Sequence, residues 1–247
     1  MRSSGVSFSV ASDAAWAPGV DTKEAWLDWA NAKRAIQPGT EPALEAMQPM
    51  LRRRAGFLGK MALEVAYQCL GRTTGVATVF SSRHGEAARS VDLLLDLAKD
   101  SPLSPTSFGL SVHNAIGGLF SIARSDHANH AALAAGDTSV EHSVIEACGL
   151  LADGEPRVLL VVYDCPLPAL YSAFEDCREE PYAWAWLMQA PGDDVVSLTW
   201  SASKEEDHPA SVERSPGGLD VLRFHLRKDR ALARISGGRR WLWTRHA

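Results

Sequence analysis

The residues best suited to chemistry in this chain lie in a short turn, Gly-Asp-Thr-Ser at positions 136–139. A serine or threonine hydroxyl acts as a nucleophile when a general base lies within about 2.6–3.2 Å. His142 follows the turn, and His113 lies one predicted helix earlier. Ser139 with His142, or Thr138 with His113, would supply such a pair. Either pair would suit an acyltransferase or a hydrolase.

The same turn also has a purely structural interpretation, which we favour. Asp137 could act as a base or as a carboxylate nucleophile, but a carboxylate at the start of a helix also suits the helix dipole. Thr138 and Glu141 have the spacing of a capping box, in which each side chain bonds the other residue's backbone N–H. No third group that would orient a histidine is evident in the sequence. We therefore expect Asp137 and Thr138 to cap the next helix and His142 to face solvent or another subunit.

Apolar strands alternate with helices on both sides of this turn. Three apolar runs read as buried strands, at residues 76–81, 131–135 and 158–163. Four segments have the apolar spacing of helices: 51–70, 87–99, 111–123 and 143–152. This alternation is typical of an α/β fold with a largely parallel sheet and helices on both of its faces.

The remaining segments are less regular. Residues 6–10 alternate as a first strand, and prolines break the pattern after Asp164. The later predictions are strands at 184–188 and 195–201 that pair antiparallel with each other, a polar loop at 204–216, a strand or short helix at 219–227 and a short terminal strand at 241–243. Because no repeat or linker is evident, we expect a single domain over residues 1–247.

Several blocks of the sequence resemble the N-terminal half of the β-ketoacyl synthases, members of the thiolase-like superfamily. The most specific block is SPTSFGLSVHNAIGGLFSIA at 104–123. Four other blocks support it: RRRAGFLGKMALEVAYQCL at 52–70, SSRHGE at 81–86, GEPRVLLVVYD at 154–164 and GGLDVLRFHLRKDRALARISGGRRWLWTR at 217–245. The chain is most similar to the short ketosynthase-like proteins of aryl polyene and related pigment gene clusters.

In the synthases a strand ends in small residues and a nucleophilic cysteine, followed by a helix, a Gly-Glu turn and another strand. The same spacing, counted back from Gly154-Glu155, puts Asp137 at the cysteine position, with Gly136 and Thr138 as its neighbours. None of these residues is a thiol. The synthases also need two histidines and a glycine-rich motif from a second half-domain, which these 247 residues do not contain. The resemblance therefore implies a thiolase-like half with antiparallel C-terminal additions, and it argues against self-sufficient condensation chemistry.

The resemblance implies a non-catalytic subunit of the chain length factor type, which forms a heterodimer with a full-length ketosynthase. It also implies an acyl carrier protein as a further partner, in aryl polyene or related fatty acid and polyketide biosynthesis. The residues expected at the acyl channel or the subunit interface are His113, Asn114, Ile116, Gly117, Gly118 and Leu119. Two alternatives stay open: an acyltransferase or hydrolase using Ser139 or Thr138, and a homodimeric scaffold that binds an acyl carrier protein without a ketosynthase.

Composition narrows the other possibilities. The net charge of −5 gives no basic footprint for nucleic acid. Residues 52–54 are three arginines that could meet an acidic acyl carrier protein, but we favour a solvated helix start. No apolar stretch reaches the roughly 18–20 residues of a membrane span, and serines interrupt the start of the chain, so we expect a cytoplasmic protein.

Other potential sites look structural in the sequence. Asp126, His127 and His130 supply too few ligands for zinc, so we expect no metal, and no motif calls for a cofactor. His84 and Gly85 read as a simple turn. The four cysteines show no CxxC spacing and are expected to be reduced. Trp26, Trp29, Trp184 and Trp186 suit either an interface or an ordinary core.

Overall fold

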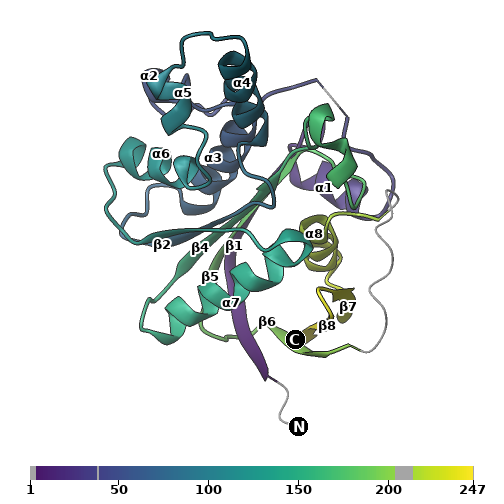
Figure 1. Cartoon of the computed structure of the whole chain (residues 1–247). Coiled ribbons are helices and arrows are strands. Elements are labelled where there is room, and N and C mark those ends of the chain that lie inside the picture. Colours follow the sequence, from purple (N-terminus) through teal and green to yellow (C-terminus); the bar gives the residue numbers. More distant parts are fainter. Residues whose placement is uncertain (1–3, 38, 204–213, 247) are drawn as a thin grey trace.

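One mixed sheet of eight strands runs through this computed structural model, which describes residues 4–37, 39–203 and 214–246 (Figure 1). The strand order is β3-β2-β4-β5-β1-β6-β8-β7. The strands are β1 (Ser4–Trp16), β2 (Ala77–Ser81), β3 (His130–Leu133), β4 (Val158–Asp164), β5 (Tyr182–Gln189), β6 (Val195–Ala202), β7 (Ala231–Ser236) and β8 (Arg239–His246).

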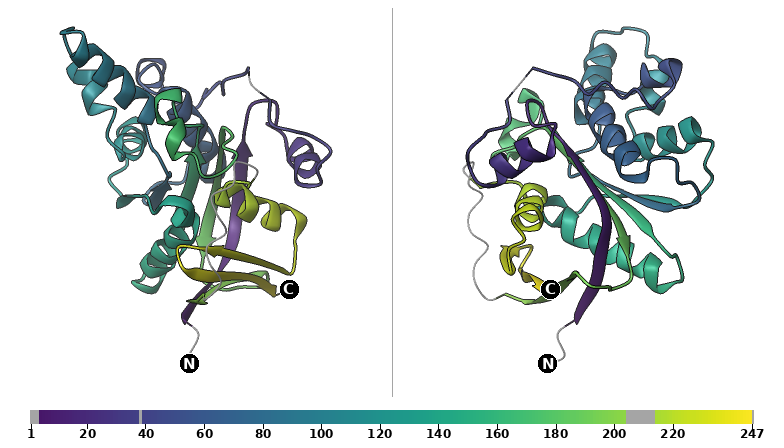
Figure 2. Two further views of the ribbon diagram at one scale, coloured as in Figure 1. Left: turned by 45° about the vertical axis from the view of Figure 1, so that its right-hand side comes forward. Right: turned by 180° about the vertical axis from the view of Figure 1, so that it is seen from behind.

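Helices cover both faces of this sheet. They are α1 (Lys23–Ala30), α2 (Pro49–Arg52), α3 (Phe57–Leu70), α4 (Ala87–Ala98), α5 (Pro105–Gly109), α6 (Ala115–Arg124), α7 (Ser139–Ala152) and α8 (Gly217–Arg227), with short 3₁₀ turns η1 (Gly136–Thr138) and η2 (Ala169–Phe174). Helices α2 to α6 lie on one side of the sheet, and α1, α7 and α8 lie on the other (Figures 1 and 2). The predicted α/β architecture is therefore confirmed. None of the described helices has the length and apolar character needed to cross a bilayer.

The position of strand β4 between two helical layers explains its continuous apolar sequence. Leu159 and Val161 pack with α3 and α6 in one core, whereas Leu160 and Val162 pack with α7 in the other. Successive side chains of a strand point to opposite faces, so a strand between two helical layers needs apolar residues at every position. The prediction that this strand is covered on both faces is confirmed.

Parallel pairing is confined to a smaller part of the sheet than the alternating pattern indicated. Strand β2 pairs in parallel with β3 and β4, and the other pairings are antiparallel. The two predicted strands β5 and β6 exist but do not pair with each other. The long strand β1 lies between them, with residues Ser4 to Phe8 on β6 and residues Ser9 to Trp16 on β5. Pattern alone could not show that the first strand separates two later ones.

Three further predictions need correction at their boundaries. The helix expected over 51–70 is broken between α2 and α3, where Gly56 adopts an extended conformation as the N-cap of α3. The helix expected over 111–123 begins only at Ala115. The strand expected to be buried at 131–135 is β3, an edge strand whose side chains are partly exposed.

Segment 219–227 is helix α8, and 241–243 belongs to β8. Most of the loop expected at 204–216 lies outside the described residues.

We predict that Gly218→Ala destabilises the protein. A Cβ atom on Gly218 would lie 2.2 Å from the hydroxyl oxygen of the fully buried Tyr182, so α8 could no longer pack against β5 as it does. Such overpacking typically costs about 1–3 kcal/mol, measured as the free energy of unfolding in urea. Gly149→Ala is the matched control, because a Cβ atom there meets nothing within 4 Å in α7 and should leave stability unchanged or slightly raised. Equal stability of the two variants would contradict this account.

Candidate functional site

The turn between β3 and α7 uses its hydroxyl groups to hold its own backbone. Thr138 Oγ1 donates to the carbonyl oxygen of Ala135 at 2.8 Å. Ser139 Oγ donates to the carbonyl of Gly136 at 2.7 Å and accepts from the Ala135 N–H at 2.9 Å. Both side chains are buried. The two candidate nucleophiles are therefore structural groups of the turn in this arrangement.

The structure does not bring either hydroxyl to a histidine. His142 Nδ1 donates to the backbone carbonyl of Thr138 at 2.9 Å, and its ring packs edge-on against Trp241 at 5.3 Å. His113 Nε2 donates to the carbonyl of Ser82 at 2.9 Å. The described contacts thus give neither the Ser139/His142 pair nor the Thr138/His113 pair. His142, which we expected to face solvent or another subunit, is partly covered by a residue of β8.

A buried arginine from β7 occupies the space beside the turn. Arg234 Nη2 lies 3.1 Å from Asp137 Oδ1 and donates to the Asp137 carbonyl oxygen at 3.2 Å. Its Nη1 donates to Glu141 Oε1. The Arg234 side chain is 5% exposed and that of Glu141 is completely buried. A buried charge is tolerated only when it is paired, as these groups are, although Asp137 Oδ2 and Glu141 Oε2 accept no hydrogen bond among the described residues.

The capping box expected between Thr138 and Glu141 is therefore wrong. The Thr138 side chain is already bonded to Ala135, and Glu141 turns inward to Arg234 instead of back to the start of the helix. The helix α7 has no side-chain cap. Sequence reasoning missed Arg234 because its partners lie about a hundred positions earlier, and local spacing carries no signal for such a pair.

Further charges complete this network. Arg214 Nη2 lies 3.5 Å from Asp137 Oδ2, and Asp220 Oδ2 lies 3.8 Å from Arg234 Nε. Burial disfavours the charged form of Arg234, but the neighbouring carboxylates of Glu141 and Asp137 raise its pKa above the ordinary value. Burial likewise raises the pKa of Asp220, against the opposing attraction of Arg234. The arginine therefore stays charged, as the carboxylates around it require.

Little space remains at the turn. The gap bounded by Asp137, Ser139, Tyr182 and Gly217 has a volume of only about 10 Å³. That is about the smallest volume that holds one water molecule. A Cβ atom on Gly217 would lie 2.2 Å from Arg234 Nη2, so the guanidinium fills the space above this glycine. An acyl group has no room here in the described arrangement.

No cysteine takes the place of the missing nucleophile at the turn. The four cysteines are free. Cys69 and Cys148 are buried, as the sequence predicted. Burial raises the pKa of Cys148 to about 12 and that of Cys165 to about 12, so both stay protonated thiols at neutral pH.

A second charged cluster ties together the ends of β2 and β4. Asp164 Oδ1 accepts hydrogen bonds from Ser82 Oγ and the Arg83 N–H, both at 2.8 Å. Asp176, Cys177 and Glu179 lie nearby with the ligand types and spacing of a metal site.

Arg83, however, already serves as the cation of this second cluster. Its Nη2 contacts Asp176, and its Nη1 lies 2.9 Å from Cys177 Sγ and 3.7 Å from Glu179 Oε1. A guanidinium in that position satisfies these groups electrostatically, and a metal ion would have to displace it. Asp126 was a possible metal ligand in the sequence. Its carboxylate instead accepts hydrogen bonds from the backbone N–H groups of Gly75 and Ala128.

The residues expected at an acyl channel or interface divide into two groups. Ile116 and Leu119 are buried in the core between α6, α3 and the sheet, and Gly117 packs closely against Phe80. Asn114 is exposed at the start of α6, and Gly118 has open space where a side chain would be. His113 anchors the turn after β2, as described above. Their assignment to a channel or interface stays a prediction.

We predict that Arg234→Met is strongly destabilising. It would leave Glu141 as an unpaired, fully buried carboxylate, a change that typically costs about 3–5 kcal/mol of unfolding free energy in urea denaturation. The double variant Arg234→Met/Glu141→Met should recover most of this loss, because it removes both charges together.

Asp229→Asn is the matched control, since this partly exposed carboxylate pairs with the half-exposed Arg227 and should matter by about 1 kcal/mol or less. A loss for Arg234→Met no larger than that of the control would refute the role given to the arginine.

We also predict a pH-dependent contribution from Glu179. Burial raises its pKa, but the hydrogen bonds from His84 and the Leu167 N–H, and the charge of Arg83, outweigh burial and hold the pKa below 4.5. Its stabilisation is therefore present at neutral pH and is lost as the pH falls through the lowered pKa. Glu179→Gln should cost about 1–3 kcal/mol at pH 7, with the difference from wild type shrinking toward pH 3 in chemical denaturation. A pH-independent difference would contradict the assignment, and the exposed Glu146→Gln serves as control.

Known proteins share this architecture. The family model "β-ketoacyl synthase, N-terminal domain" matches residues 26–244. No curated protein sequence matches significantly. A chain of the complex of ketosynthase ApeO with its chain length factor ApeC, from Xenorhabdus doucetiae, is 26% identical, with a TM-score of 0.81. The match covers 97% of this chain and 99% of that one, so the fold corresponds to a whole chain of that complex.

More distant solved structures share the fold. The ishigamide ketosynthase/chain length factor is 14% identical over 82% of this chain and 69% of its own, with a TM-score of 0.65. The AntDE:AntF complex, a type II polyketide synthase acyl carrier protein with its ketosynthase, is 11% identical over 98% of this chain and 99% of its own, with a TM-score of 0.69. The thiolase-like fold class is thereby confirmed. Since the family model covers most of the sequence, the chain belongs to the β-ketoacyl synthase N-terminal domain family.

Proposed function

We propose that this chain is a non-catalytic, ketosynthase-like subunit of the chain length factor type. It pairs with an active β-ketoacyl synthase in the cytoplasm and shapes the space available to the growing acyl chain on a carrier protein. The proposal takes the chain as a single domain over residues 1–247. An aryl polyene or related polyketide pathway fits the similarity to a chain of the ApeO–ApeC complex.

The observation that carries the proposal is the turn at the start of α7. Asp137 occupies the cysteine position suggested by the family spacing. Its carboxylate forms ion pairs with Arg234 and Arg214. The hydroxyls beside it are bonded to backbone carbonyls, and only about 10 Å³ is left open. A condensing enzyme needs a reactive thiol and room for a thioester, and neither is supplied by this turn. Catalysis is therefore assigned to the partner.

A surface suited to that partner lies on the opposite edge of the sheet from the C-terminal hairpin. Strand β3 ends the sheet, and its outer N–H and C=O groups have no neighbouring strand among the described residues. Beside it, α6 carries Ile122, which is 62% exposed, and on the same side of the sheet α4 and α5 carry Leu97 and Phe108, exposed at 58% and 64%. An open edge with adjacent apolar side chains is a surface that proteins normally cover. We assign it to the ketosynthase.

The acyl carrier protein would meet a different part of the molecule. Arg53 and Arg54 are exposed after α2, whereas Arg52 is partly covered and donates to the backbone carbonyl of Ala43. Two free guanidinium groups on an otherwise acidic chain would attract an acidic carrier protein by charge complementarity. A turn separates residues 52–54 from α3, so they do not form the start of that helix, and we assign them to the carrier protein.

Co-expression with the full-length ketosynthase of the same gene cluster tests the pairing. A stable one-to-one complex is expected by native mass, and Ile122→Asp together with Phe108→Asp should reduce co-purification at least tenfold, because charges would be buried without partners. Leu27→Asp on α1, across the sheet, is the control and should leave the complex intact. Failure to form a complex, or equal loss with the control, would overturn this interface.

The same complex separates a non-catalytic role from the alternative enzyme. Condensing activity is expected to require this chain and to survive Asp137→Ala, Thr138→Ala and Ser139→Ala, provided that each variant still folds and co-purifies. Incubation of the isolated chain with an acyl thioester should give no acylated protein by mass spectrometry. Acylation at Ser139 or Thr138 would instead establish an acyltransferase or hydrolase.

A further inference from the structure

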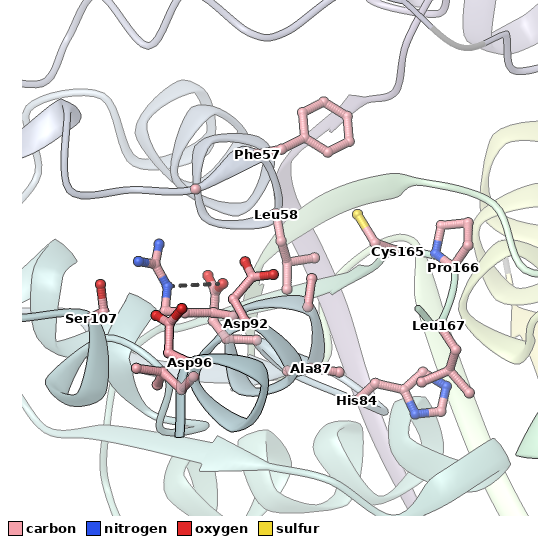
Figure 3. Close-up of a pocket in the computed structure, with 16 residues that line it drawn as sticks. Phe57, Leu58, His84, Ala87, Asp92, Asp96, Ser107, Cys165, Pro166 and Leu167 are labelled. Carbon is pink, nitrogen blue, oxygen red and sulfur yellow. Dashed lines mark ion pairs between the residues drawn. The ribbon is translucent and has the colours of Figure 1, made fainter. Parts of the chain in front are cut away.

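A cavity of about 410 Å³ opens away from the turn described above, at the carboxyl ends of β2 and β4 (Figure 3). Its walls come from the start of α3, from residues 84–89 with the following turns of α4, and from residues 165–167 after β4. The chain leaves β2 toward β3 on one side and leaves β4 toward β5 on the other. In α/β sheets, such a reversal of strand order is where ligands are most often bound.

The floor of this cavity is apolar. It is formed by the side chains of Phe57, Leu58, Ala87, Leu93, Pro166 and Leu167. Figure 3 shows Leu58 and Ala87 in the middle of the cavity, with Asp92, Asp96 and Ser107 on one side and Cys165, Pro166 and Leu167 on the other. A ligand that fills this space must therefore bring an apolar body to the floor and polar groups to one end.

Glu86 is the buried polar group at this site. Its side chain is only 10% exposed, and Arg89 is its one charged partner among the described residues. Arg89 Nε lies 3.6 Å from Glu86 Oε2, which is electrostatic attraction but longer than a normal hydrogen bond. Arg89 Nε is itself buried without a hydrogen-bond partner. Burial raises the pKa of Glu86, against the opposing charge and hydrogen bond of Arg89. A carboxylate has about four acceptor positions, and this single long contact with Arg89 leaves room for a further donor from the cavity.

The charges around the cavity select the kind of donor. Asp92 and Asp96 also line it, and neither forms an ion pair within the described residues. Among the described residues, Arg89 is the only arginine or lysine on the walls, and His84 is bonded to Glu179 through Nε2. Three carboxylates against one guanidinium favour a cation over a neutral group, and they disfavour an anion.

We propose that this cavity binds a small amphipathic amine. The ammonium group donates a hydrogen bond to Glu86, and Asp92 and Asp96 add attraction at longer range. The aliphatic or aromatic body lies on Phe57, Leu58 and Leu167. This inference does not depend on the proposed pairing, because every group it uses belongs to this chain.

Titration of the isolated chain with three six-carbon probes tests the site: hexylamine, hexanol and hexanoate at pH 7, followed by calorimetry and by amide chemical shifts. Hexylamine should bind with a dissociation constant of about 1 mM or lower, and hexanoate at least tenfold more weakly. Shifts should concentrate at Phe57, Ala88 and Leu167. Glu86→Gln should weaken hexylamine binding tenfold or more, since a hydrogen bond to a charged group is lost. Asp96→Asn should weaken it less.

The controls make the outcomes distinct. Glu146→Gln, an exposed carboxylate on α7, should bind hexylamine as wild type does. Thermal unfolding of Glu86→Gln shows that the variant is folded, and Asp96→Asn tests the charge of the cavity independently. Equal binding of hexylamine to wild type and Glu86→Gln, equal binding of hexanoate and hexylamine, or no binding of hexylamine would each overturn the proposal. None of these results would bear on pairing with a ketosynthase.

Discussion

The buried guanidinium of Arg234 is the interaction on which the arrangement around the turn depends. It connects a late strand, β7, to the turn before α7 through Asp137 and Glu141, and it packs directly over Gly217 at the start of α8. Removing a charge from water is costly, so such a group is stable only where every neighbour has the matching sign and geometry. The C-terminal hairpin, α8 and α7 are therefore held in register by one side chain. The same side chain fills the space beside the turn.

The two faces of the sheet are covered by helical layers of different chemical character. The side of α7 and α8 is closed by aromatic packing and by ion pairs, with Trp184, Trp186, Trp241 and Trp243 all fully buried. The side of α4, α5 and α6 is open at its edge and carries apolar residues in contact with solvent. Tryptophans that suited either an interface or a core from sequence alone thus belong to the core. The residues that suit an interface are instead leucine, phenylalanine and isoleucine on short helices.

The sequence predicted the helices and strands, whose patterns are local, but not the contacts between residues far apart in the chain. Strand β4 and helix α3 were predictable because apolar side chains must cover both faces of an inner strand and one broad face of a helix. The family was recognisable from the block around Asn114. The partner of Glu141 was not, because an inward-turned glutamate and a capping glutamate have the same spacing from Thr138. Likewise, β1 between β5 and β6 follows from tertiary pairing that no local period encodes.

The open edge at β3 has a consequence for the protein in the cell. A short strand with unpaired backbone groups, next to α6 and its exposed Ile122, can add to another exposed strand. A chain made in excess of its partner would therefore be prone to self-association and to capture by chaperones or proteases. Under the proposed pairing, its usable amount would be set by the supply of the ketosynthase, so the two chains would need balanced synthesis.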